Sequence, residues 1–118
     1  MAVLASVAMD LINDKGANRA KMDGFIEKAA AQHADFILFP ELALGGLPIN
    51  PMFVFNPDDA KYQHDVAELV PEGDSTQHFI DMAKKHDIYI GWGMAEQSHE
   101  RFDVLYNTLV IVGPEGFV

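Results

Sequence analysis

Short apolar runs alternate with amphipathic stretches along the first third of this 118-residue chain. The run at residues 2–9 is rich in Val, Leu and Ala, which predicts a strand buried on both faces, and the run at 36–39 predicts a second, central strand. Between them, residues 17–33 place apolar side chains at helical spacing. Pro40 ends the second strand because proline has no N–H for the ladder. This order of elements predicts a parallel crossover unit.

The second half of the chain has the pattern of a helix followed by a hairpin. An amphipathic stretch from residue 74 or 75 to about residue 86 predicts a helix capped by Asp74 or Ser75. Residues 88–95 and 104–112 predict two strands joined by a polar link. This helix is expected to cover the sheet, as the first one does.

Two further segments have turn or loop character. Residues 45–74 are rich in proline and glycine and predict a long loop with a short helix within 58–69, and loops of that length are more often functional than idle. "GPEG" at 113–116 predicts a turn. Phe117 and Val118 then resemble the start of another strand, for which we expect no partner within the chain.

Composition narrows the class of protein. The length and the 49% hydrophobic content predict one domain over residues 1–118, and 18 acidic against 8 basic residues give a net charge of -10. That charge repels phosphate backbones and anionic lipids, which argues against nucleic acid and membrane surfaces as partners. The first apolar run has no basic segment before it, and Asp10 stops it short of a membrane span, so we expect a cytoplasmic protein.

Several kinds of chemistry find no support in the sequence. The chain contains no cysteine, which excludes a disulfide, a thiolate metal site and a cysteine nucleophile within these residues. The five histidines are not spaced as metal ligands, and no serine lies in a nucleophile elbow. No glycine-rich phosphate loop is present either. We therefore expect neither a metal nor a cofactor.

Three polar or aromatic positions remain as candidates. Glu41 follows the central strand, where open α/β sheets place their ligand clefts, so it is either a general base in a cleft or a solvated acid at a loop mouth. Asn107 interrupts an apolar strand, and its amide either ties down a neighbouring loop or contacts a ligand. Trp92 lies between two glycines and is either a core aromatic or a ligand platform.

Three motifs in order carry a family resemblance: "AQHADFILFPELALGG", "STQHFIDMAKKHDIYIGWGMAE" and "YNTLVIVGPEG". With these, the whole chain resembles the amino-terminal part of the nitrilase superfamily, the carbon-nitrogen hydrolases. The resemblance implies an α-β-β-α sandwich, of which this chain would hold the amino-terminal part. It also implies a Glu-Lys-Cys catalytic triad in which Glu41 is the general base.

The activity implied by the resemblance is hydrolysis of a small amide, nitrile or carbamoyl compound. In such enzymes the cysteine thiolate attacks the carbon, the lysine stabilises the tetrahedral intermediate and ammonia or an amine leaves. Water activated by the glutamate then hydrolyses the thioester. The residues that would bind the substrate are not identified by the motifs.

The chain also departs from the family pattern. The chain has no cysteine, and none of its six lysines matches the family's lysine motif. The lysines are Lys15, Lys21, Lys28, Lys61, Lys84 and Lys85. Gly46 is followed by Leu47 where the family often has a tyrosine, and a glutamine common after the first strand has no counterpart beside Met9. We therefore expect a truncated domain that is inactive alone and that forms a homo-oligomer or associates with the remainder of the fold. The alternative is an inactive remnant or an assembly module of the same fold.

Overall fold

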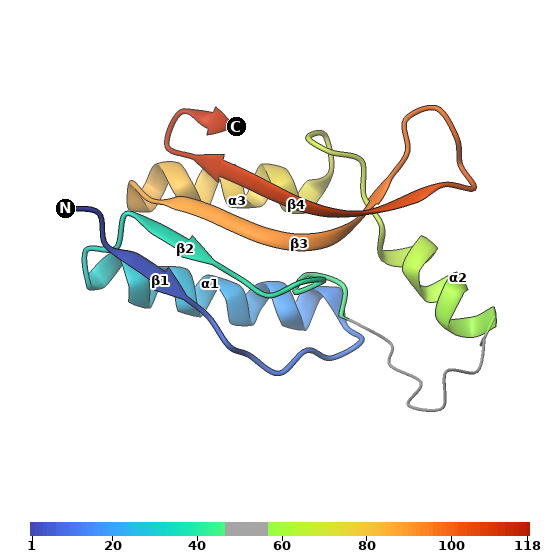
Figure 1. Ribbon diagram of the computed structural model, residues 1–118, viewed down its shortest axis with the longest axis horizontal. Coiled ribbons are helices and arrows are strands. Elements are labelled where there is room, and N and C mark those ends of the chain that lie inside the picture. The colour runs from blue at the N-terminus through green and yellow to red at the C-terminus, as the bar shows by residue number, and fades with distance from the viewer. Residues whose placement is uncertain (47–56) are drawn as a thin grey trace.

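A computed structural model describes residues 1–46 and 57–118 of the chain, and Figure 1 shows its elements. They are β1 (Leu4–Ser6), α1 (Lys15–Ala31), β2 (Phe36–Leu38), α2 (Pro57–Val66), α3 (Asp74–His86), β3 (Tyr89–Gln97), β4 (Leu105–Gly113) and β5 (Gly116–Phe117). Both covering helices and the β3–β4 hairpin agree with the sequence-based prediction to within about two residues. The part of the predicted long loop at 47–56 lies outside the described residues.

The strands form one mixed sheet with the order β1-β2-β3-β4-β5. The first three are parallel, and Leu4, Phe36 and Tyr89 are neighbours in register, which confirms the predicted crossover. β4 returns antiparallel to β3. The carboxyl end of β3 therefore lies beside the beginning of β4. β2 ends earlier, level with Gly91, and the segment that follows it continues along the middle of β3.

Helices α1 and α3 cover one face of the sheet, and the strands lie in front of them in Figure 1. Trp92 points to this face and is fully buried against Phe79 of α3, with ring centroids 4.6 Å apart. Met22 and Ile26 of α1 are equally buried. Trp92 is thus a core aromatic, one of the two roles that the sequence left open.

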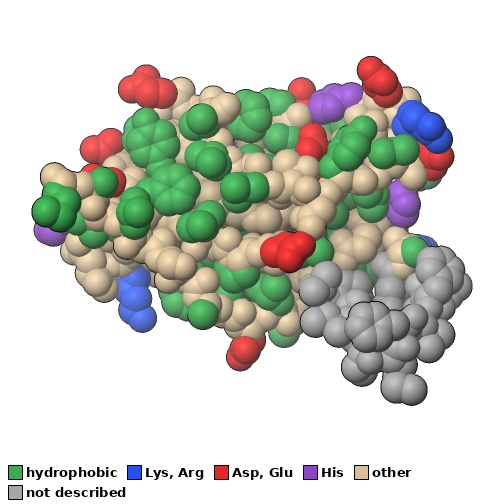
Figure 2. Space-filling model, in the orientation of Figure 1, with side chains coloured by type: hydrophobic (Ala, Val, Ile, Leu, Met, Phe, Trp, Pro, Cys, Tyr) green, Lys and Arg blue, Asp and Glu red, His purple; other side chains and the backbone are tan. Residues whose placement is uncertain are grey.

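The opposite face of the sheet has no helix over it among the described residues. Leu38, Tyr89 and Leu109 are 39%, 43% and 59% exposed there, and Figure 2 shows hydrophobic side chains gathered over the strands on this face. Leu4, in register with Tyr89 through β2, is 74% exposed. We call this surface the open face.

The prediction for residues 2–9 was wrong in two respects. Only Leu4–Ser6 form a strand, and both Val3 and Leu4 are exposed rather than buried. The exposure follows from the position of β1 in the sheet. It is an edge strand with β2 as its single neighbour, and Leu4 lies on the open face. Apolar composition alone does not distinguish an edge strand from a central one.

Two smaller predictions were also wrong. Gly116–Phe117 pair antiparallel with β4, so the end of the chain does find a partner strand by folding back across the predicted turn. At the start of α3 the N-cap is Gly73 and no side chain of the cap closes the helix, although Asp74 and Ser75 had been the candidates. The side chain that satisfies this helix terminus is instead Glu68, described below.

Candidate functional site

Glu41 lies just after β2 in a sharp turn, residues 40–46, which we call the elbow. Backbone hydrogen bonds dock this segment on β3: Phe39 N–H donates to the Gly91 carbonyl at 2.9 Å, and the Gly93 N–H donates to the Pro40 carbonyl at 3.3 Å. Leu42 has a positive φ of 51°, a left-handed conformation that bends the chain back at once. The elbow therefore presents Glu41 beside β3 rather than away from the sheet.

Gly93 makes this close approach sterically feasible. A Cβ atom at this position would lie 2.5 Å from the Leu42 nitrogen and 2.8 Å from the Glu41 Cα, and both are backbone atoms of the elbow. Such distances are far below van der Waals contact. Any side chain at position 93 would therefore push the elbow off β3, which gives the "GWG" motif a structural explanation.

The elbow is also fixed from the helical side. Asn18 of α1 is fully buried and donates from its amide to the Leu44 carbonyl at 3.1 Å and to the Ile12 carbonyl at 2.7 Å. From α2, the Tyr62 hydroxyl donates to the Gly45 carbonyl. Contacts from α1, α2 and β3 thus hold the backbone of the elbow in place. This backbone sets the position from which the Glu41 side chain extends.

Asn107 of β4 completes the site by contacting Glu41 directly. Its side-chain Nδ2 donates a hydrogen bond to Glu41 Oε1 at 2.6 Å. The two residues border a pocket of about 350 Å³ on the open face, with mostly apolar walls. The other lining residues are Leu38, Phe39, Gly93, Thr108 and Leu109. A carboxylate, an amide donor and apolar walls are the elements of a small-molecule site.

The structure answers part of what the sequence left open about these residues. Asn107 is exposed rather than buried, and it contacts the elbow, in agreement with the loop-tying role. Glu41 is exposed as well, at the mouth of the pocket. Leu47, which replaces a frequent family tyrosine, lies outside the described residues.

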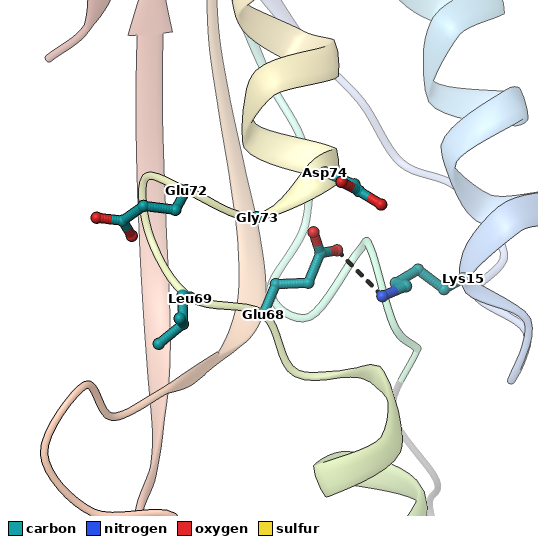
Figure 3. Close-up of a pocket in the computed structure, with 6 residues that line it drawn as sticks. All are labelled: Lys15, Glu68, Leu69, Glu72, Gly73 and Asp74. Carbon is teal, nitrogen blue, oxygen red and sulfur yellow. Dashed lines mark ion pairs between the residues drawn. The ribbon is translucent and has the colours of Figure 1, made fainter.

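A second glutamate, Glu68, forms a separate polar junction that sequence analysis missed. Its carboxylate accepts hydrogen bonds from the Ser75 N–H at 2.8 Å and from the Ser75 hydroxyl at 2.6 Å, and Lys15 Nζ lies 3.1 Å away. Figure 3 shows Lys15 and Glu68 pointing toward each other across a pocket of about 300 Å³. Lys15 also donates to the Val66 carbonyl. The beginnings of α1 and α3 and the end of α2 therefore meet at one ion pair.

The electrostatics of Glu68 follow from these contacts. Burial by itself would raise the pKa of this carboxyl, since its side chain is only 9% exposed. The hydrogen bonds from Ser75 and the charge of Lys15 outweigh burial and hold the pKa of Glu68 below its ordinary value. This carboxylate is ionised and contacts three donor groups, which is typical of a structural role.

Histidines form pairs with acids rather than a cluster. His78 lies 2.7 Å from Asp23, and His99 lies 3.0 Å from Glu72, all four being partly or well exposed. Within residues 1–46 and 57–118, no group of three or more His, Cys, Asp or Glu side chains is arranged to hold a metal ion. No helix in these ranges is long and apolar enough to cross a membrane.

Solved structures with a similar fold define the class of protein. The chain superposes on the NitFhit protein of C. elegans with a TM-score of 0.76 at 21% identity, covering 98% of this chain and 27% of that one. An N-terminal amidase crystallised with a Gln-Gly peptide gives a TM-score of 0.74 at 21% identity, over 98% of this chain and 26% of that one. The chain thus has the nitrilase-like α/β fold and matches about a quarter of the length of these solved chains.

Sequence comparison gives the family. The carbon-nitrogen hydrolase family model matches residues 3–118, and the chain belongs to this family. It is 34% identical over 101 residues to a nitrilase of Pyrococcus abyssi, covering 86% of this chain and 34% of the relative. It is also 34% identical over 115 residues to the omega-amidase NIT2 of Homo sapiens, covering 96% of this chain and 36% of the relative. The chain therefore spans about a third of the length of these relatives.

Proposed function

We propose that this chain supplies the general base, Glu41, of an enzyme that hydrolyses a non-peptide carbon-nitrogen bond in a small amide, nitrile or carbamoyl compound. A lysine and a cysteine from outside these 118 residues would complete the triad. On this proposal the isolated chain is inactive. The observation that carries it is the elbow, which holds one carboxylate at the mouth of a pocket in a chain of the carbon-nitrogen hydrolase family.

For an amide substrate the proposed chemistry balances with Glu41 as the proton carrier. Glu41 accepts the cysteine thiol proton while the sulfur bonds to the carbonyl carbon, and the proton then passes to the leaving nitrogen, which departs as ammonia. In the second half, Glu41 accepts a proton from water while the water oxygen bonds to the thioester carbon. The carbon-sulfur bond then breaks, Glu41 returns that proton to the departing thiolate, and the carboxylic acid is released.

The names of the relatives support the substrate class. One relative is named a nitrilase and another an omega-amidase, so the names of similar proteins include both nitriles and amides as substrates. The N-terminal amidase of similar fold was crystallised with peptides that begin with Gln or Asn. These names favour a carboxamide or nitrile carbon as the reacting atom.

The test is Glu41→Gln in the complete native protein, with ammonia release measured on a panel of small amides and nitriles. We expect kcat to fall by about 10²- to 10⁴-fold, since that is what one acid-base group typically contributes. The thermal midpoint should stay close to that of the wild type, because Gln can still accept the bond from Asn107. Glu115→Gln, a change to an exposed acid in the β4–β5 turn, is the matched control and should leave kcat unchanged. Near-normal turnover in Glu41→Gln would refute the proposal.

The open face favours a second candidate, a binding or assembly module without catalytic activity. Leu4, Tyr89 and Leu109 leave apolar side chains exposed on this face, and contiguous exposed apolar surface marks interaction sites in soluble proteins. In that case the same half-fold would bind a partner or a second copy of itself. We also propose an oligomer in either case, because such a face is stabilised when it is covered.

Light scattering separates the candidates when it is combined with the activity assay. A hydrolase fragment that awaits the rest of its fold should form dimers or larger aggregates as the isolated 118-residue chain. Two results together would favour the module. The isolated chain would be monodisperse and melt cooperatively, and the native protein would release no ammonia from any amide or nitrile. A stable monomer would also contradict the proposed oligomer.

A further inference from the structure

We propose that Asn107 is a positioning residue that orients the Glu41 carboxylate for proton transfer. The inference rests on the proposed function of Glu41 and adds a second residue to it, from a different strand. Its starting point is the hydrogen bond of 2.6 Å from Asn107 Nδ2 to Glu41 Oε1, between residues 66 positions apart in sequence. Asn107 is assigned no contact with the substrate.

Both ends of this hydrogen bond are held by backbone. Asn107 is in register with Ala95 in the β3–β4 ladder, and the Ala95 carbonyl accepts a further bond from Glu68 N–H at 3.3 Å. Glu41 rests on β3 at Gly93, where no side chain intervenes. Two rigid segments therefore fix donor and acceptor, so the bond sets the orientation of the carboxylate rather than following it.

An amide is chemically suited to this task. Asn107 Nδ2 is a donor that does not titrate, so it engages one carboxylate oxygen without competing for the proton that a general base must carry. Among the residues that the structure describes, the second oxygen of Glu41 has no hydrogen-bond partner. One oxygen is thereby anchored, and the other is available for proton transfer.

The surroundings contain few other charges that could take over this role. Among the described residues that line the pocket, Glu41 is the one with a titratable side chain. Glu96, on the neighbouring strand β3, alternates to the opposite face and accepts a bond from the Thr108 hydroxyl. The helix α2, which approaches the elbow, contributes Tyr62 to a backbone carbonyl rather than to Glu41.

The test compares Asn107→Ala, Asn107→Asp and Glu41→Gln in the complete native protein by steady-state ammonia release. We expect Asn107→Ala to lower kcat by about 10- to 100-fold, because small misplacements of a catalytic group cost up to that much, while KM changes by less than about threefold. Tyr106→Ala, which truncates an exposed side chain on the same strand, is the control and should leave kcat unchanged. Circular dichroism checks that all variants are folded.

The Asn107→Asp variant supplies a readout that a merely structural role would not move. It keeps the shape of Asn107 but sets a carboxylate beside Glu41, and two such groups share a proton more readily as the pH falls. The kcat of this variant should therefore be low at neutral pH and recover partly at lower pH, unlike that of Asn107→Ala. An identical pH profile in the two variants would overturn the inference.

The outcomes distinguish this inference from the function on which it rests. If Glu41→Gln is inactive while Asn107→Ala turns over at the wild-type rate, Glu41 keeps its role and Asn107 loses its own. If Glu41→Gln is active, the proposed function itself fails. As an independent measurement, the Asn107 side-chain amide resonances should shift during an acid titration of the wild type and not in Glu41→Gln; the same shift in both proteins would contradict the contact.

Discussion

Two glutamates of this chain, Glu41 and Glu68, show opposite ways of holding a carboxylate. Glu68 is 9% exposed, accepts two hydrogen bonds from Ser75 and pairs with Lys15. Glu41 is exposed, accepts one bond from Asn107 among the described residues and borders an apolar pocket. The contrast lies in how many of the acceptor sites on each carboxylate are occupied.

The difference teaches how to separate a structural acid from a candidate catalytic one. A saturated carboxylate stabilises the fold because removing it strands its donors, whereas a carboxylate with a free oxygen can still accept a proton. Burial and charge alone would have selected Glu68 as the more unusual group. Its occupied acceptor sites identify it instead as a structural acid at the junction between α1, α2 and α3.

The largest stability effect should come from Glu68→Gln, which we expect to lower the free energy of unfolding by about 3 kcal/mol. The change removes the charge that balances Lys15 and weakens both bonds from Ser75 in a largely buried position. Urea denaturation measures the loss. Glu72→Gln is the control, since Glu72 is 60% exposed and its loss should be barely measurable. Equal losses of unfolding free energy in the two variants would mean that the Glu68 junction contributes no more to stability than an exposed acid does.

Gly93→Ala should come next, with a loss of about 1 to 3 kcal/mol, because the added methyl group meets the backbone of the elbow. This variant disturbs the support of Glu41 and leaves the Glu68 junction intact. Thermal denaturation monitors stability, and the Asn107 amide signal reports on the elbow. Gly24→Ala is a control of opposite sign, since its Cβ meets nothing within 4 Å on helix α1 and Ala favours helix. A neutral Gly93→Ala would show that the elbow can move away from β3.

A smaller loss, about 1 kcal/mol, is expected for Ser75→Ala. The variant removes the hydroxyl bond to Glu68 but keeps the backbone N–H bond of the same residue. Comparison with Glu68→Gln in a double-mutant cycle gives the coupling between the two side chains. Strictly additive losses would indicate that the hydroxyl acts independently of the carboxylate.

The smallest effect is the pH dependence of the Glu68 junction. Because contacts with Ser75 and Lys15 outweigh burial and lower the pKa of Glu68 in the folded state, its contribution to stability is fully present above the ordinary carboxyl pKa of 4.5. It is lost as the pH falls through the lower pKa of the folded state. The stability difference between wild type and Glu68→Gln should thus be constant from neutral pH to about pH 5 and shrink below it. A difference that grows on acidification would contradict this assignment.

Much of the fold could be predicted from the sequence because its signals are local. Patterns within a short window of sequence predict the helix that contains Met22 and Ile26, the strand that ends before Pro40, and the hairpin. The pairing of Phe117 with β4 and the exposure of Leu4 could not be predicted in the same way. Both depend on which strand becomes an edge, and that is a property of the assembled sheet.

The site was predictable to a similar extent. Glu41 is indicated by its position after a central strand, and Asn107 by an amide inside an apolar run, but their contact depends on sheet order. Glu68 was not identified from the sequence, because the contact that distinguishes it is made with Lys15, which lies far away along the chain. Gly93 could be recognised as unusual between Trp92 and Met94, although the close approach of the elbow that requires it was not visible.

The distance along the chain between Glu41 and Asn107 bears on how the protein folds. The hairpin needs only the short link 98–104 to close, so β3 and β4 can pair at a low cost in loop entropy. The parallel pairing of β2 with β3 must close a far longer loop and is expected to form more slowly. Since Glu41 meets Asn107 only when both pairings exist, a partly folded chain carries the acid without its orientation. The geometry of the site is therefore a late product of folding.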